Sequence, residues 1–97
     1  MEQYIILRRN GFTSHEDLER RGKVSAEVGD TPGSGVRWIR SYVLNEESGE
    51  VGTVCIYEAD SPEAIRAHAA AATLPVDEII PVMDTVVVRP DPVAANA

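Results

Sequence analysis

One histidine and one glutamate are the residues of this chain best placed for chemistry. The segment 62–72 has the composition of a helix, and His68 falls on its apolar stripe. Glu58 ends the apolar segment before this helix, with a parity that we expect to point toward the helix. A carboxylate beside an imidazole orients a catalytic histidine or supports a metal ligand. A structural histidine with satisfied hydrogen bonds is the simpler explanation, and the pattern alone favours it.

A divalent metal is the first possible ligand of His68. Imidazole and carboxylate ligands suit borderline ions such as nickel or zinc. The positions three and four residues after His68 are alanines, so Glu58 or Asp77 would have to join it through the fold or from a second subunit. The other histidine, His15, lies in a predicted exposed helical turn, and we interpret it as a surface residue.

The predicted strands carry two different sets of side chains, because successive residues of a strand point to opposite faces. We expect the aliphatic set to pack against helices: Ile5, Leu7, Ile39, Ser41, Val43, Val54, Ile56, Val86 and Val88. We expect the aromatic and polar set on a bare face: Tyr4, Ile6, Arg8, Trp38, Arg40, Tyr42, Thr53, Cys55, Tyr57, Thr85 and Val87. Exposed apolar faces mark interaction or ligand surfaces.

Two compatible explanations of this bare face remain open. One is a homodimer in which two sheets pack face to face, since interfaces favour aromatic residues and arginine. The other is that the two sheets also enclose a small-molecule pocket. The ligand-binding candidates are Trp38, Arg40, Tyr42, Cys55 and Tyr57, with Thr53 as a further polar lining residue.

A cofactor-independent enzyme, such as an isomerase, cyclase or monooxygenase with a hydrophobic substrate, is the alternative to a binding protein. In that case His68 would be the general acid or base, and Glu58 would orient it. Tyr57 or Arg40 would stabilise an oxyanion. An accessory interaction module without a small ligand is a third possibility.

The elements that must position these residues follow the order β-α-β-β-α-β. Apolar β-branched runs predict strands at 4–8, 36–44, 51–58 and 84–89, and capping signals predict helices at 14–28 and 62–72. The first helix has a thin apolar face of Leu18, Gly22, Ser25 and Val28. The order predicts a ferredoxin-like α+β domain over 1–89, an antiparallel sheet with both helices on one face. Residues 90–97 are expected to form a loosely held tail.

Composition limits the classes of partner. The 97 residues predict one small domain, for which pairing with a second copy adds stability. The formal charge of -7 disfavours nucleic acid and anionic membranes. One cysteine excludes an internal disulfide, and the short N-terminal apolar run precedes its arginines, unlike a signal peptide. We therefore expect a cytoplasmic protein.

Four motifs carry a resemblance to a known family: WIRSY at 38–42, CIYE at 55–58, PEAIRAH at 62–68 and LPVDEI at 74–79. With these motifs the chain resembles small bacterial ferredoxin-like proteins, long catalogued as a domain of unknown function, one member of which is described as nickel-binding. The resemblance spans about residues 4–82. It implies a homodimeric α+β barrel, possible nickel binding, and site candidates at Trp38, Tyr57, Glu58 and His68, with Cys55 behind them.

Overall fold

The computed structural model describes residues 1–92, which form one sheet and two helices. The elements are β1 (Glu2–Phe12), α1 (His15–Gly29), β2 (Val36–Asn45), β3 (Val51–Ala59), α2 (Pro62–Ala71) and β4 (Glu78–Pro81). The side chains of Ser14 and Ser61 cap the two helices by accepting hydrogen bonds from the backbone N–H groups of Asp17 and Ala64. The predicted element order is therefore confirmed.

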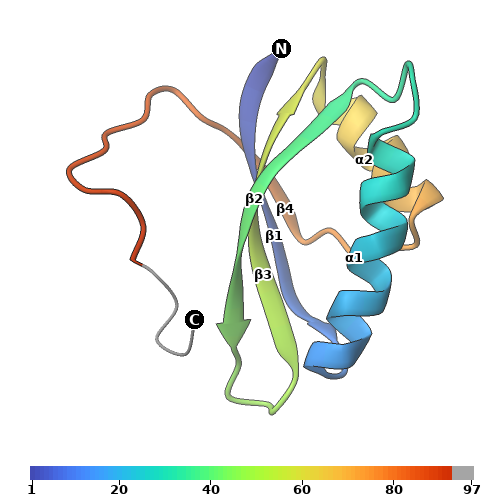
Figure 1. The fold of residues 1–97 in the computed structure, drawn as a ribbon, viewed down its shortest axis with the longest axis vertical. Helices are drawn as coiled ribbons and strands as arrows, with labels where there is room; N and C mark the ends of the chain where they lie inside the picture. The colour runs from blue at the N-terminus through green and yellow to red at the C-terminus, as the bar shows by residue number, and fades with distance from the viewer. Residues whose placement is uncertain (93–97) are drawn as a thin grey trace.

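The four strands form one antiparallel sheet in the order β2-β3-β1-β4. Both helices lie on the same side of this sheet, and no part of residues 1–92 forms a helix on the other side (Figure 1). This is the ferredoxin-like arrangement expected from the sequence. The sheet therefore has a helix-facing side and an open side.

The predicted assignment of the two side-chain sets to these sides is wrong for β1 and β3, whereas in β2 Arg40 and Tyr42 lie on the open side and Ser41 and Val43 on the helix-facing side, as expected. The aromatic and polar set is the buried one in β1 and β3: Tyr4, Ile6, Arg8, Thr53, Cys55 and Tyr57 all lie under the helices. Ile5, Leu7, Val54 and Ile56 lie on the open side and are half-buried. The physical reason lies in α1, whose inward residues are small, so that large side chains from the sheet are needed to reach it.

A β-bulge divides the residues of β2 between the two sides. The register with β3 shifts between Trp38, which pairs with Tyr57, and Arg40, which pairs with Ile56. Trp38 therefore lies on the helix-facing side, whereas Arg40 and Tyr42 lie on the open side. Simple alternation placed all three on one face, and the extra residue of the bulge separates them.

The last strand also differs from the prediction. It was expected at 84–89, but β4 is Glu78–Pro81. Its antiparallel register with β1 brings Pro81 opposite Tyr4, and the Val82 N–H donates to the Gln3 carbonyl. Since β1 begins at Glu2, its pairing with β4 ends near Val82, and the later residues do not continue it. Val86 and Val88 are instead about 83% and 78% exposed.

The segment after β4 leaves the sheet on its open side and loops outward, away from both helices (Figure 1). Asp91 accepts hydrogen bonds there from the Tyr42 hydroxyl at 2.9 Å and from Arg40 at 3.1 Å. The predicted tail at 90–97 lies largely outside the described residues, which end at 92. No helix within 1–92 has the length and apolar character needed to cross a membrane.

Candidate functional site

A cavity of about 550 Å³ lies between α1 and the helix-facing side of the sheet. Its lining is mostly apolar and aromatic, with a few polar side chains. The residues of the sheet and adjoining loops are Arg8, Phe12, Trp38, Ser41, Val43, Thr53, Cys55, Tyr57 and Leu74. Those of α1 are Leu18, Glu19, Gly22, Lys23, Ser25 and Ala26.

The composition of α1 explains why this space is not filled. The helix presents Gly22, Ser25 and Ala26 to the cavity, and none of these side chains extends far from its axis. Protein interiors are otherwise packed as densely as organic crystals, so small residues on a facing helix leave a volume behind. The thin apolar face noted in the sequence is thus the origin of the cavity.

The sheet side of the cavity is built from three rows of paired residues. Strand register places Tyr57 between Tyr4 and Trp38, Cys55 between Ile6 and Ser41, and Thr53 between Arg8 and Val43.

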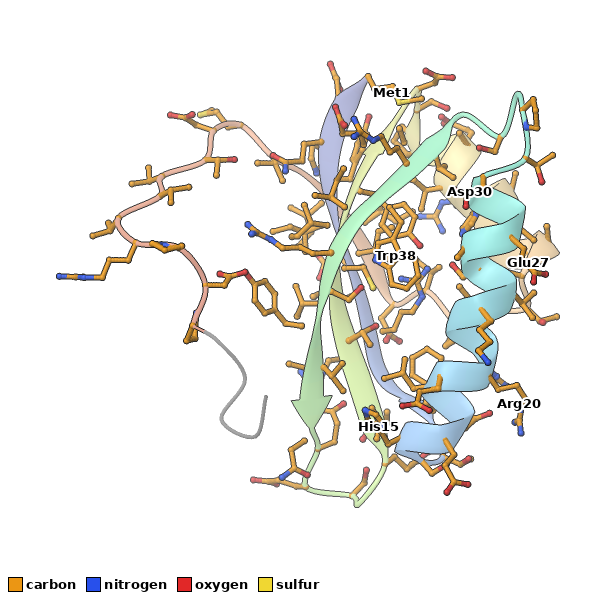
Figure 2. All side chains as sticks on the ribbon, in the orientation of Figure 1. Met1, His15, Arg20, Glu27, Asp30 and Trp38 are labelled. Atoms are coloured by element: carbon orange, nitrogen blue, oxygen red, sulfur yellow. The ribbon has the colours of Figure 1, made fainter. Side chains whose placement is uncertain are left out.

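Trp38 stacks on Tyr57 with ring centroids 6.2 Å apart and is about 40% exposed. Trp38 lies between the sheet and α1, whereas Arg20 extends from the outer face of α1 (Figure 2).

Arg8 is the most unusual residue of the lining. Its side chain is only 1% exposed, although arginine is almost never fully buried without a partner. Its Nε, Nη1 and Nη2 atoms have no hydrogen-bond partner among residues 1–92, and no described carboxylate forms an ion pair with it. Arg8 thus lines a mostly apolar cavity, and its guanidinium, buried close to the Tyr57 hydroxyl, has no counter-charge among residues 1–92.

A buried polar cluster joins this wall to α2. The Ser25 hydroxyl lies 3.0 Å from His68 Nε2 and 3.3 Å from the Tyr57 hydroxyl. The Tyr57 and His68 rings meet edge to face, with centroids 5.7 Å apart. His68 itself does not line the cavity, but Ser25 and Tyr57 do. The imidazole therefore reaches the cavity only through these two hydroxyl groups.

Burial and the charge of Arg8 set the protonation of this cluster. Burial, and then the nearby guanidinium of Arg8, lower the pKa of His68 below its ordinary value near 6.5. Burial raises the pKa of Tyr57, although the Ser25 hydrogen bond and the Arg8 charge oppose that change. At neutral pH the cluster therefore holds a neutral imidazole and a neutral phenol.

A chain of hydrogen bonds crosses the same wall. Trp38 Nε1 donates to Ser41 Oγ at 2.8 Å, Ser41 donates to Cys55 Sγ at 3.0 Å, and Cys55 donates to Thr53 Oγ1 at 3.3 Å. Thr53 accepts at the end of this chain, next to Arg8 in the sheet. Within residues 1–92 the Thr53 hydroxyl donates no hydrogen bond, and Thr53 lines the cavity. Cys55 acts here as a buried hydrogen-bonding residue.

The structure brings together only part of the predicted site. Trp38, Cys55 and Tyr57 line one cavity, under the helices and not on the bare face where we expected them. Arg40 and Tyr42 lie on the other side of the sheet, in contact with Asp91. The predicted ligand-binding set is thus divided between two sides of the sheet.

The predicted carboxylate partners of His68 lie elsewhere. Glu58 occupies the open side of the sheet, where it pairs with Arg37 at 3.1 Å, because β3 alternates and its neighbour Tyr57 points to the helices. Asp77 accepts a hydrogen bond from the backbone N–H of Arg9.

Within residues 1–92, no three histidine, cysteine, aspartate or glutamate side chains form a group suited to a metal ion. His15 is exposed and lies 3.3 Å from Glu19, as a surface residue should.

Sequence reasoning missed Ser25 and Arg8 as polar residues of this site. Ser25 was seen on the inner stripe of α1, but nothing local indicated that it would meet a histidine from a distant helix. Arg8 was assigned to the bare face, although it shares the parity of Tyr4 and Ile6 in an apolar run. A charge at a core-facing position of a strand is the signal that could have revealed it.

Comparison with protein-family models gives a match over residues 4–82 to the family described as nickel responsive protein SCO4226-like. The match covers both helices, β2, β3 and β4, β1 from Tyr4 onward, and every residue that lines the cavity. The chain belongs to this family. The family resemblance drawn from the four sequence motifs is therefore confirmed, and the SCO4226-like description links its members to a response to nickel.

Comparison with solved structures supports the fold of this SCO4226-like chain. The crystal structure of SCO4226 from Streptomyces coelicolor A3(2) superposes with a TM-score of 0.70 at 19% sequence identity. The alignment covers 87% of this chain and 99% of that one. No curated protein matches the chain. The structural match shows a shared ferredoxin-like fold.

Proposed function

We propose that this member of the SCO4226-like family is a cytoplasmic, homodimeric binding protein whose small ligand occupies the cavity between α1 and the sheet. The cavity itself carries the proposal. Its volume lies within the range typical of small-molecule sites, and its mixture of apolar walls and few polar groups is typical of them as well. The walls of this space lack packing partners in the protein, and a ligand would supply those contacts.

The open side of the sheet supports the homodimer. Strand pairing aligns Ile80, Ile5 and Ile56 across β4, β1 and β3, and aligns Leu7, Val54 and Tyr42 across β1, β3 and β2. These two rows form an apolar surface on the side of the sheet opposite α1 and α2 (Figure 1). A second copy packed sheet to sheet would bury the surface and leave both cavities on the outer sides of the sheets.

Nickel enters this proposal through the family description. The described residues of a single chain do not provide a fitting set of ligands, because Glu58 and Asp77 are engaged elsewhere and His68 contacts hydroxyl groups. The buried Nδ1 of His68 has no hydrogen-bond partner among residues 1–92. Direct binding of nickel would thus require ligands from two subunits. Isothermal titration with nickel tests this, and the absence of heat at neutral pH would leave nickel as a signal sensed indirectly.

The only tryptophan of the chain provides the test of the cavity. Trp38 lines the cavity, so its fluorescence should change saturably when a neutral apolar probe such as octan-1-ol enters. In the Ala26→Leu variant the larger side chain occupies the cavity, and we expect the probe to bind at least tenfold more weakly. Ala70→Leu makes the same change at an exposed position of α2 and should bind like the unmodified protein. Equal binding by all three proteins would refute the cavity as the site.

Catalysis at the same site is a second candidate, favoured by the contact between Ser25 and His68. A neutral imidazole that shares a hydrogen bond with a cavity-lining hydroxyl can move a proton to or from a bound molecule. Tyr57 would be the nearest oxyanion donor, whereas Glu58 and Arg40 are too far removed in the fold to take the roles we expected. Mass spectrometry of a bound ligand after incubation with the protein and with His68→Gln distinguishes turnover from binding alone.

A further inference from the structure

We infer that the cavity is specific for a monocarboxylate on an apolar body, and that the buried guanidinium of Arg8 binds the carboxylate. The inference rests on the proposed binding function and adds the chemical class of the ligand. Arg8 is 1% exposed, lines the cavity and has no hydrogen-bond partner for its side chain among residues 1–92.

The unpaired charge is the first step of the argument. A buried charge loses the hydration that it has in water, and proteins retain such groups when a counter-charge satisfies them. The acidic residue that lines the cavity, Glu19, is exposed and lies 3.3 Å from His15. The described part of the chain therefore supplies no anion for Arg8, and a ligand is the remaining source.

The number and geometry of the donors indicate the headgroup. The guanidinium fork matches the two oxygens of a carboxylate, and such bidentate pairs are among the strongest hydrogen bonds in proteins. Thr53, the neighbour of Arg8 in the sheet, has a hydroxyl hydrogen free to join them. One buried cation balances one negative charge, whereas a phosphate dianion would bring a second charge into the same apolar surroundings.

The rest of the cavity indicates the body of the ligand. Apolar and aromatic side chains make up most of the remaining lining, with Phe12, Leu18, Val43 and Leu74 among them. Trp38, partly exposed and stacked on Tyr57, lies where the cavity meets solvent along β2. An alkyl or aryl chain would therefore extend from the carboxylate at Arg8 along these apolar walls.

Three probes of equal length and different charge test the inference on the unmodified protein. Isothermal titration at pH 7.5 would compare octanoate, octan-1-ol and octylamine, with octyl phosphate as a further anion. We expect octanoate to bind about ten- to a hundredfold more tightly than octan-1-ol, and octylamine most weakly. Tighter binding of octyl phosphate than of octanoate would overturn the choice of a carboxylate.

The outcomes separate this inference from the proposed function. Equal binding of octanoate and octan-1-ol, with competition between them, would leave the cavity as a ligand site and refute the role of Arg8. Binding of none of the probes would refute the proposed function, and the inference with it. Heat from octanoate that persists unchanged in Ala26→Leu would place the anion outside the cavity and also refute the inference.

Variants of Arg8 provide an independent readout. Arg8→Met removes the unpaired charge and keeps an apolar chain, so we expect octanoate affinity to fall at least tenfold while octan-1-ol affinity is unchanged or rises. The ligand-free variant should unfold at the same or a higher temperature, because a buried charge without a partner is costly. Arg8→Lys keeps the charge without the fork and should bind octanoate with intermediate affinity. A lower unfolding temperature of Arg8→Met together with unchanged octanoate affinity would show a purely structural arginine.

Discussion

His68 is a neutral buried histidine whose ring is fixed by contacts and not by a carboxylate. Ser25 approaches its Nε2, Tyr57 meets its ring edge to face, and Gly29 leaves room for it, since an added Cβ there would lie 3.3 Å from His68 Cε1. The charge of Arg8 lies near enough to disfavour the imidazolium. A cationic His68 would therefore place two positive charges beside one cavity.

The lowered pKa of His68 predicts a pH dependence of stability. The unfolded chain protonates this residue near pH 6.5, whereas the folded chain does so only at lower pH. The free energy of unfolding should therefore fall as the pH drops from about 6.5, and should level off below the folded pKa. Urea unfolding of the protein and of His68→Gln between pH 7.5 and 5 measures this difference. The variant should show a flatter profile.

The chain contains a matched control for this experiment. His15→Gln makes the same change at an exposed position and should keep the full pH dependence. Two buried carboxylates should not interfere with this comparison. A hydrogen bond from the Thr13 backbone lowers the pKa of Asp17, and one from Arg9 lowers the pKa of Glu46, so both groups titrate at more acidic pH than the histidine. Identical profiles for the protein and His68→Gln would contradict the lowered pKa of His68.

Two glycines, one in α1 and one in β3, differ in the space available for a side chain. A Cβ on Gly22 of α1 would meet the Trp38 ring at 3.9 Å, an ordinary contact. A Cβ on Gly52 of β3 would lie 2.8 Å from both the Arg8 carbonyl oxygen and the Glu46 carboxylate. One position thus has room for a side chain, whereas backbone and a buried carboxylate occupy the space at the other.

The same substitution at these two positions should therefore have opposite effects. Gly22→Ala should raise the free energy of unfolding by about 0.5–1 kcal/mol, because alanine favours a helix interior more than glycine does. Gly52→Ala should lower it by about 1–3 kcal/mol through the forced displacement of β1. Chemical denaturation of both variants measures the two effects. A neutral Gly52→Ala would contradict the close approach of β1 and β3.

The elements also show what the sequence can and cannot predict. Local signals, such as the Ser61 cap, located both helices, and the order of elements led to the correct sheet. Local sequence did not indicate which side-chain set of β1 and β3 faces the helices. Both sets were plausible core faces, and the small residues of α1 decided between them. The valines at 86–88 favoured a strand by composition, but β1 had already been paired to its end by residue 82.

The candidate site was predictable only where one element determined it. Tyr57 and Cys55 share a face because they are two residues apart, and Trp38 joined them through strand pairing. The contact between Ser25 and His68 depends on the packing of α1 against α2, for which no sequence pattern was visible. Glu58 points to the same side of β3 as Val54 and Ile56. Because that side was expected to face the helices, Glu58 was expected beside His68.

The open side of the sheet presents an apolar surface that neither helix covers, and from it we predict a concentration-dependent homodimer. Ile56→Glu places a charge among the open-side residues, so this variant should sediment as a monomer under conditions in which the unmodified protein is dimeric. Ala70→Glu introduces the same side chain at an exposed position of α2 and should remain dimeric. A monomeric unmodified protein in analytical ultracentrifugation, at concentrations up to about a millimolar, would contradict the prediction.

The central claim is that the space between α1 and the sheet is a ligand site with a cationic end. A crystal structure of the protein grown with octanoate tests this claim most directly. We expect electron density for the alkyl chain between α1 and β3, with the carboxylate within hydrogen-bond distance of the Arg8 guanidinium. Octanoate found only on the open side of the sheet, beside a cavity filled by rearranged side chains, would contradict it.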